Sequence, residues 1–110
     1  MPKYLIHGSY TLDGVRGLIK EGGSARRSHF KENVSNLKGE VEAFYFAFGG
    51  DDLYAVVDLP DNVSGAAISL ALGAGGGFRA NTIALLTAEE IDQAARRVAS
   101  VGYRPPGESR

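Results

Sequence analysis

The spacing of hydrophobic residues predicts a strand and then a helix at the start of the chain. Residues 3–10 begin with Tyr-Leu-Ile and are typical of a strand. Thr11 stands where a helix N-cap is expected, since its hydroxyl can accept a bond from a free backbone N–H. Val15, Leu18 and Ile19 then recur at helical spacing.

Two adjacent glycines, Gly22 and Gly23, interrupt this helix. Inside a helix they would cost roughly 2 kcal/mol relative to alanines, so we expect a break there. Ser24 can cap a second segment, and Gly39 is expected to end it as a left-handed residue. The buried stripe of this segment should hold Phe30, Val34 and Leu37.

The clearest strand is expected over residues 40–48, because aromatic side chains crowd residues 44–46. Residues 49–52, Gly-Gly-Asp-Asp, have the composition of a hairpin loop. The return strand is expected over residues 53–59, since Pro60 cannot donate to a sheet ladder.

A further helix and strand follow the hairpin. Asp61 or Asn62 can cap a helix rich in alanine, and the glycines within residues 73–77 close it. A fourth strand is expected over residues 79–86.

The chain is expected to end in a helix and a tail. Thr87 and Glu90 have the spacing of a capping box, and the helix should run to about residue 99. The adjacent prolines Pro105 and Pro106 favour an extended backbone. We therefore expect one domain over residues 1–100 and an extended tail over residues 101–110.

The order strand, helix, strand, strand, helix, strand, with an added C-terminal helix, predicts an α+β, ferredoxin-like fold with an antiparallel sheet. Such a sheet carries helices on one face, and side chains alternate between its two faces. The face expected under the helices holds Ile6, Phe44, Phe46, Phe48, Ala55, Val57, Ile83 and Leu85. The opposite, mixed face should hold Leu5, His7, Ser9, Val41, Ala43, Tyr45, Ala47, Tyr54, Val56, Asp58 and Thr82.

Composition narrows the classes of function. The 110 residues are 44% hydrophobic and 23% charged, which suits one packed domain. A net charge of −1 creates no overall field for nucleic acid or an anionic membrane, and neither partner is expected. Without cysteine there are no disulfides and no thiolate chemistry, and no motif indicates a metal or a cofactor. The apolar stretches are short, so a cytoplasmic protein is expected.

Several stretches resemble the GYD-domain family of small bacterial and archaeal proteins along nearly the whole chain. They are residues 21–27 (EGGSARR), 42–49 (EAFYFAFG), 57–64 (VDLPDNVS), 85–87 (LLT) and 103–107 (YRPPG). The family's Gly-Tyr-Asp stretch reads Gly-Asp-Asp at residues 50–52, with Asp51 in the position of the tyrosine. The resemblance implies a dimeric α/β-barrel type of ferredoxin-like fold, hence a homodimer or higher oligomer, and implies no catalytic residues.

His7 is the first candidate for chemistry, as an imidazole in mid-strand on the mixed face. Pairing of the first and third strands would bring Asp58 diagonally near it, and a carboxylate there would orient the ring of a general base. A histidine that is hydrogen-bonded in a subunit interface, without chemistry, explains the same residue.

Other side chains suit a ligand. Tyr45, Tyr54 and Thr82 share the mixed face and would bind through hydroxyls and rings, although packing of the tyrosines at a dimer contact is the alternative. Arg26 and Arg27 add guanidinium groups to the free N–H groups of a helix start, which suits a phosphate or carboxylate. Solvated arginines on a restarted helix also explain this pair.

Three hypotheses for function follow. The first is a homo-oligomeric protein that binds a small molecule between the mixed sheet face and a partner subunit. The second is a cofactor-free enzyme, of monooxygenase or isomerase type, that uses the same pocket with His7 as base. The third is a structural or regulatory assembly module whose sheet face is filled by packing alone.

Overall fold

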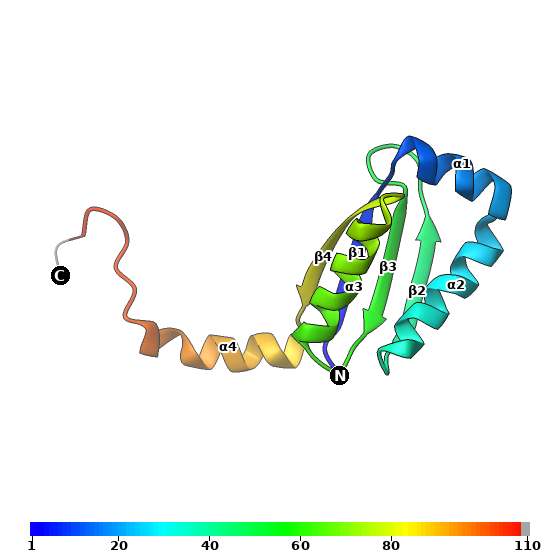
Figure 1. The fold of residues 1–110 in the computed structure, drawn as a ribbon. Coiled ribbons are helices and arrows are strands. Elements are labelled where there is room, and N and C mark those ends of the chain that lie inside the picture. The colour runs from blue at the N-terminus through cyan, green and yellow to red at the C-terminus, as the bar shows by residue number, and fades with distance from the viewer. Residues whose placement is uncertain (109–110) are drawn as a thin grey trace.

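A four-stranded antiparallel sheet in the order β2-β3-β1-β4 is the frame of the protein (Figure 1). The computed structural model describes residues 1–108. Its elements are β1 (Lys3–Tyr10), α1 (Leu12–Glu21), α2 (Gly23–Asn36), β2 (Glu40–Phe46), β3 (Leu53–Asp58), α3 (Asn62–Gly75), β4 (Phe78–Leu85) and α4 (Ala88–Val101). All three ladders are antiparallel, and the predicted α+β ferredoxin-like fold is confirmed.

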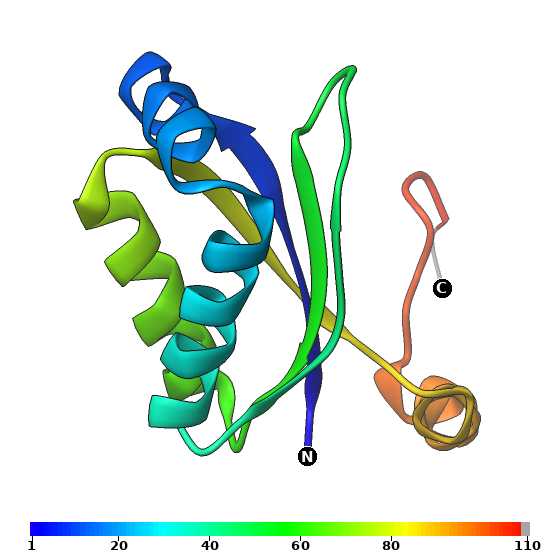
Figure 2. The same ribbon diagram turned by 90° about the vertical axis from the view of Figure 1, so that its right-hand side faces the viewer.

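Helices cover only one face of this sheet. Figure 2 shows α1, α2 and α3 together on one side of the strands. The buried core lies beneath them and consists of Tyr4, Ile6, Phe30, Val34, Leu53, Ala55, Val57, Leu59 and Ile68. We call the other side the open face; by strand register it carries Lys3, Leu5, His7, Ser9, Ala43, Tyr45, Tyr54, Val56, Asp58, Arg79, Asn81, Ile83 and Leu85.

The predicted break between the first two helices falls at Gly22. This residue has φ +91°, its N–H closes the last turn of α1 on the Leu18 carbonyl, and its own carbonyl accepts from the N–H of Arg26. A positive φ of this kind favours glycine. Because Gly22 itself is the N-cap of α2 and no side chain caps that helix, the prediction that Ser24 caps it is wrong.

The end of α2 also differs from its prediction. Lys38, with φ +64°, adopts the left-handed conformation that was expected at Gly39. Gly39 is needed for another reason: a Cβ there would lie 2.3 Å from the Asp58 carbonyl oxygen. The glycine therefore allows the chain to enter β2 in close contact with the end of β3.

The two faces of β4 are reversed relative to the prediction. Register places Ile83 opposite Leu5 on the open face and Thr82 opposite Ile6 on the helix face. The prediction placed the largest apolar residues of this strand, including Leu85, under the helices. Apart from Phe78 at its start, β4 presents small residues on the helix side, where the Ser69 hydroxyl of α3 donates to Thr82 Oγ1.

Two residues of the second strand also leave their predicted places. A bulge between Val41 and Ala43 inserts one residue, so that Val41 turns toward the core instead of the open face. Phe48 lies beyond the end of β2 in the hairpin and is 99% exposed rather than buried. Phe44 and Phe46 do lie on the helix side, where their rings meet edge to face at 5.2 Å.

α4 extends away from the body as an arm (Figure 1). The predicted capping box of Thr87 and Glu90 is present, and Gly102 ends the helix in the left-handed conformation. The extended tail, expected over residues 101–110, begins after Val101 and contains a turn at residues 106–107; residues 109–110 lie outside the described part. The radius of gyration is 17.8 Å, against roughly 13 Å for a compact chain of this length.

A pair of isoleucine variants tests the assignment of the two faces. Ile6→Ala should lower the free energy of unfolding by about 2–5 kcal/mol, because the side chain is fully buried and its loss leaves a cavity. Ile83→Ala, on the open face, should cost less than about 1 kcal/mol in the monomer. Denaturant titrations at two protein concentrations measure both. Equal losses at the lower concentration would place Ile83 in the core and contradict the register of β4.

Candidate functional site

His7 lies on the open face and meets a carboxylate from the hairpin between β2 and β3. Its Nδ1 is 2.5 Å from Oδ2 of Asp51, and both side chains are about a quarter exposed. The predicted partner, Asp58, does not reach it. The register pairs His7 with Tyr54 and places Asp58 opposite Lys3, at the far end of the strand.

Backbone contacts between the hairpin and β1 fix the position of Asp51. The N–H of Asp52 donates to the Gly8 carbonyl at 2.8 Å, and its carboxylate accepts from the N–H of Tyr10 at 2.9 Å. The Ser9 hydroxyl donates to Asp51 Oδ1 at 3.3 Å. The loop is therefore attached to β1 at the three residues that follow His7.

Aromatic side chains continue from His7 across the sheet. Tyr54 stands opposite His7 on β3, and their rings stack with centroids 5.9 Å apart and planes within 10°. Tyr45 stands opposite Tyr54 on β2, and Asn81 stands opposite His7 on β4. We call these four residues the polar row. They bring a carboxylate-bound imidazole, two phenols and an amide to one line on the open face.

The chemistry of the row follows from the His7–Asp51 bond. The Asp51 carboxylate accepts a hydrogen bond from Nδ1–H of the neutral ring, which leaves Nε2 without a proton and free to accept. No residue of the described chain hydrogen-bonds to Nε2. The arrangement can accept a hydrogen bond from a ligand, and it has the form of an oriented general base.

The other predicted ligand residues do not join this row. Thr82 lies on the helix face, bonded to Ser69. Arg26 donates to Glu21 from Nε at 2.7 Å and from a terminal nitrogen at 2.8 Å, while Arg27 is exposed on α2. The guanidinium expected to bind an anion is thus already paired with a carboxylate.

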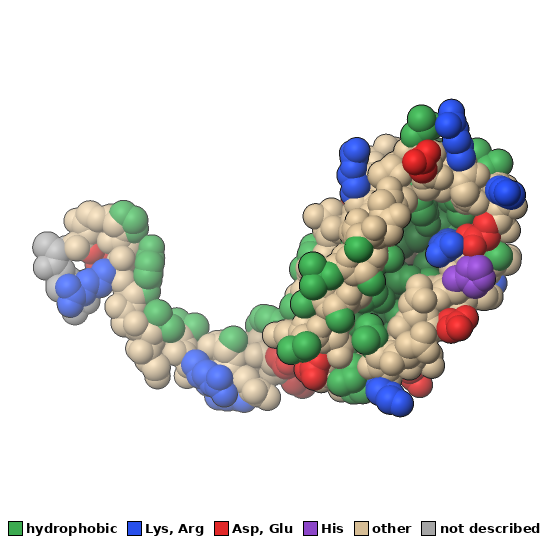
Figure 3. All heavy atoms as spheres, in the orientation of Figure 1, with side chains coloured by type: hydrophobic (Ala, Val, Ile, Leu, Met, Phe, Trp, Pro, Cys, Tyr) green, Lys and Arg blue, Asp and Glu red, His purple; other side chains and the backbone are tan. Residues whose placement is uncertain are grey.

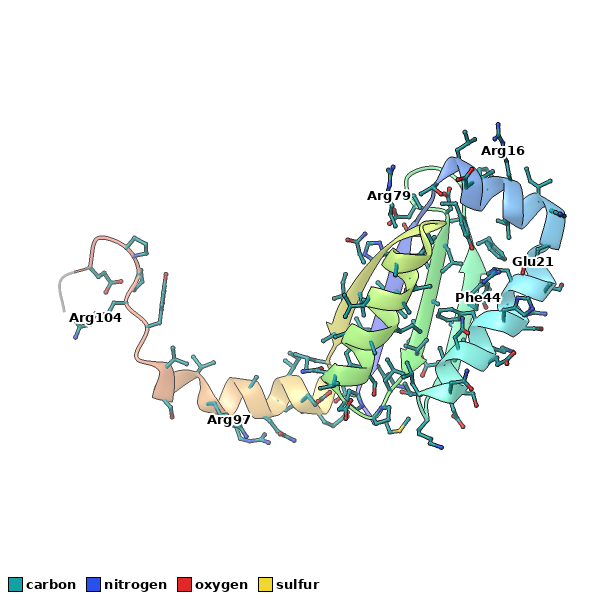
Figure 4. The ribbon with its side chains drawn as sticks, viewed as in Figure 1. Arg16, Glu21, Phe44, Arg79, Arg97 and Arg104 are labelled. Atoms are coloured by element: carbon teal, nitrogen blue, oxygen red, sulfur yellow. The ribbon has the colours of Figure 1, made fainter. Side chains whose placement is uncertain are left out.

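Glu21 joins the two helices at their corner, where Figure 4 labels it. Besides Arg26 it contacts Nδ1 of His29 at 2.9 Å. The hydrogen bond from Arg26, and then the charges of Arg26 and His29, hold the pKa of Glu21 below its ordinary value of 4.5. The corner is therefore an electrostatic contact rather than an anion site.

Lys3 binds two carboxylates on the open face. Its ammonium lies 2.8 Å from Asp58 and 2.6 Å from Glu42, and these bonds, Asp58 first, raise the pKa of Lys3 well above its ordinary range. Asp58, predicted to serve His7, instead pairs with Lys3, whose ammonium joins β1, β2 and β3 at one end. Asp51 is the candidate site residue that the sequence analysis missed, and its only signal was an aspartate in a hairpin loop near the end of the histidine strand.

Comparison with known proteins identifies a family and no close relative. The family model described as GYD domain matches residues 4–95. No curated protein and no solved structure gives a significant match to the chain. Within residues 1–108, no helix combines the length and apolar character that crossing a membrane requires, and no three acidic, histidine or cysteine residues cluster as metal ligands.

Replacing Asp51 should change the tautomer of His7. In the native protein the neutral ring should carry its proton on Nδ1, and Asp51→Ala should shift it toward the Nε2–H form because the acceptor is removed. Imidazole ¹⁵N chemical shifts report the tautomer directly. Asp58→Ala is the control and should leave the ring unchanged; an equal shift in both variants would contradict the assigned partner.

The acid response of the protein should depend on Glu21. Because the pKa of Glu21 is lowered on folding, its stabilisation is present above about pH 4.5 and is lost as the pH falls through the lowered value. Glu21→Gln should reduce Tm at neutral pH, and the difference from the native protein should shrink as the pH falls. Glu32→Gln, on α2 without an ion pair in the described chain, should behave like the native protein. A difference in Tm that is constant with pH would contradict this role.

Proposed function

The chain belongs to the GYD domain family, and we propose that it is a homo-oligomer that binds a small molecule against the open face, under a second copy of the chain. The observation that carries the proposal is the polar row. An imidazole fixed by Asp51 and stacked on the ring of Tyr54 stands on a sheet face that the chain's own helices leave uncovered.

The apolar part of the open face supports a protein partner. Tyr45 is 72% exposed, Ile83 46% and Tyr54 42%, and Leu5, Val56 and Leu85 lie between or beside them. Isolated apolar residues are normal on a protein surface, but a continuous patch of this kind marks an interaction site. Because β4 turns Ile83 and Leu85 outward, this patch is larger than the sequence predicted.

The arm supplies the second surface. All residues of α4 are exposed, and Ile91, Val98 and Val101 recur on one side of the helix. An isolated helix of fourteen residues is marginal in water, so its stability calls for packing against another surface. The arm leaves on the open-face side of the sheet (Figure 2). A second copy that binds the open face can therefore also receive the arm, and can return both contacts by two-fold symmetry.

The polar row indicates the chemistry of the ligand. Nε2 of His7 offers an acceptor, the tyrosine hydroxyls and the Asn81 amide offer donors and acceptors, and the rings offer flat apolar surface. These groups suit a planar molecule with polar atoms at its edge. The partner copy would cover the other side of the molecule and exclude water from it.

Sedimentation at micromolar concentration tests the assembly. The native chain should sediment at twice its mass of 11.6 kDa or more. Val98→Asp should raise the dissociation constant at least about 30-fold, the change expected when an interface loses about 2 kcal/mol. Ser100→Asp adds the same charge to another side of α4 and should leave the oligomer intact. A native chain that stays at 11.6 kDa at every concentration would end the proposal.

A fragment screen tests the ligand site separately. Fragments that bind should shift the His7 ring resonances. Both Asp51→Ala and the monomeric Val98→Asp should lower the affinity of these fragments. Fragments that bind the monomer with equal affinity would show that the partner subunit does not contribute to the site. An oligomer that binds no fragment at His7 would favour the assembly-module hypothesis.

A cofactor-free enzyme is the second candidate, and the His7–Asp51 bond is the observation that favours it. In that case His7 would remove a proton from a bound substrate while Asp51 holds the ring in the required tautomer. His7→Gln retains hydrogen bonding through its amide but cannot act as a base near neutral pH. It should therefore abolish turnover of a fragment-derived substrate while changing the affinity for that substrate by no more than about tenfold. If the site only binds, the native protein should show no turnover either.

A further inference from the structure

A cavity of about 380 Å³ lies on the other side of the sheet, between the strands and the helices. α2 packs over β2 and α3 over β4, so the two central strands form the floor of a gap between these helices. Figure 3 shows the hollow between α3 and α2, with hydrophobic side chains in its depth and charged side chains along its α2 rim. Ile6 and Leu53 are part of its lining.

Small residues keep this space open. Gly17 of α1 and Gly75 of α3 line it, and a Cβ at either position would meet nothing within 4 Å. Neither glycine is thus required by a close neighbour. Gly14 differs, because a Cβ there would lie 1.8 Å from the Gly77 carbonyl oxygen and would push α1 away. Protein interiors rarely leave voids larger than a water molecule, and this volume lies in the range of small-molecule sites.

The lining is largely aromatic and aliphatic. Two pairs of rings contribute to it: Tyr10 with Phe78, at 4.9 Å between centroids, and Phe30 with Phe44, at 5.4 Å. Figure 4 shows Phe44 between β2 and α2. Tilted ring pairs of this kind provide both faces and edges for a further ring to pack against.

The polar groups of the cavity carry no free charge. Arg26 is bound at two points by Glu21, and the Asn33 amide is neutral. The Tyr10 hydroxyl has no hydrogen-bond partner within residues 1–108. Burial, more than the neighbouring charges, raises the pKa of Tyr10, so this group remains a protonated phenol that can donate and accept.

We propose that this cavity is a second binding site, for a neutral ring-sized molecule with one hydrogen-bonding oxygen, of which a phenol is the simplest example. The rings and aliphatic side chains would hold its apolar body, and the Tyr10 hydroxyl would bind its oxygen. An anionic ligand is disfavoured because it would have to displace Glu21 from Arg26. The site lies across the sheet from the polar row and does not depend on the oligomer.

Titration with p-cresol, toluene and benzoate, followed by calorimetry and by the resonances of the cavity rings, tests the proposal. p-Cresol should saturate one site per chain and bind at least tenfold more tightly than benzoate. Tyr10→Phe should reduce the affinity for p-cresol to that for toluene. Gly17→Leu replaces a glycine by a better helix former and fills the cavity, and it should lower the affinity for p-cresol at least tenfold. The matched change is Gly73→Leu, which lies in α3 outside the lining, where a Cβ would meet nothing within 4 Å. This variant should leave the affinity for p-cresol unchanged.

Three results would overturn the proposal: no saturable binding of p-cresol up to its solubility limit, tighter binding of benzoate, or full affinity in a folded Gly17→Leu variant. If that variant does not fold, Ala71→Leu fills the cavity from α3 instead, and full affinity for p-cresol in this variant would equally overturn the proposal. His7→Gln and Val98→Asp should retain p-cresol binding, because both change the other side of the molecule. This site and the open-face site can therefore fail independently.

Discussion

β1 and β3 pair at the centre of the sheet and present apolar side chains to both faces, Ile6 and Val57 on one and Leu5 and Val56 on the other. Such strands need cover on both sides, because exposed apolar area costs free energy in proportion to its extent. Within residues 1–108 the chain provides three helices for one face and none that covers the second. The open face, the unpartnered arm and the cavity all result from this unequal cover.

On the covered side, the helices lie over the edge strands rather than the middle of the sheet. The buried strand residues of the core lie on β1 and β3, beneath α2 and α3, while small residues on α1 and α3 leave space over part of the same two strands. A tightly packed domain of this fold would fill that space with larger side chains. On the open side the same two strands carry His7 and Tyr54, the middle of the polar row, so β1 and β3 present a different chemical surface on each face.

Local signals in the sequence predicted the elements well. The cap at Thr11, the break at Gly22, the aromatic strand and the box of Thr87 and Glu90 each depend on a few neighbouring residues, and each is present. Apart from the cap expected at Ser24 and the left-handed residue expected at Gly39, errors arose where the answer depends on the pairing of distant residues. The faces of β4 are decided by its register with β1, and hydrophobicity alone misassigned Ile83 and Thr82.

The candidate site shows the same division. Sequence parity placed His7, Tyr45 and Tyr54 together on one face, and the register agrees. The partner of His7 could not be predicted, because the position of Asp51 depends on how the hairpin folds back over β1, and that fold depends on the contacts of Asp52 with Gly8 and Tyr10. Arg26 was misjudged because the path of the chain around Gly22 brings Glu21 within reach of it.

Gly8 occupies the point where β1 lies between the hairpin and β4. A Cβ at this residue would lie 1.9 Å from the Arg79 carbonyl oxygen and 3.0 Å from the Phe78 ring, while its own carbonyl accepts from Asp52. No larger side chain fits without parting the strands, and parting them would also move the loop that carries Asp51. The pairing of the strands and the orientation of His7 therefore depend on the same position. A larger side chain at Gly8 would disturb the sheet and the His7–Asp51 contact in one step.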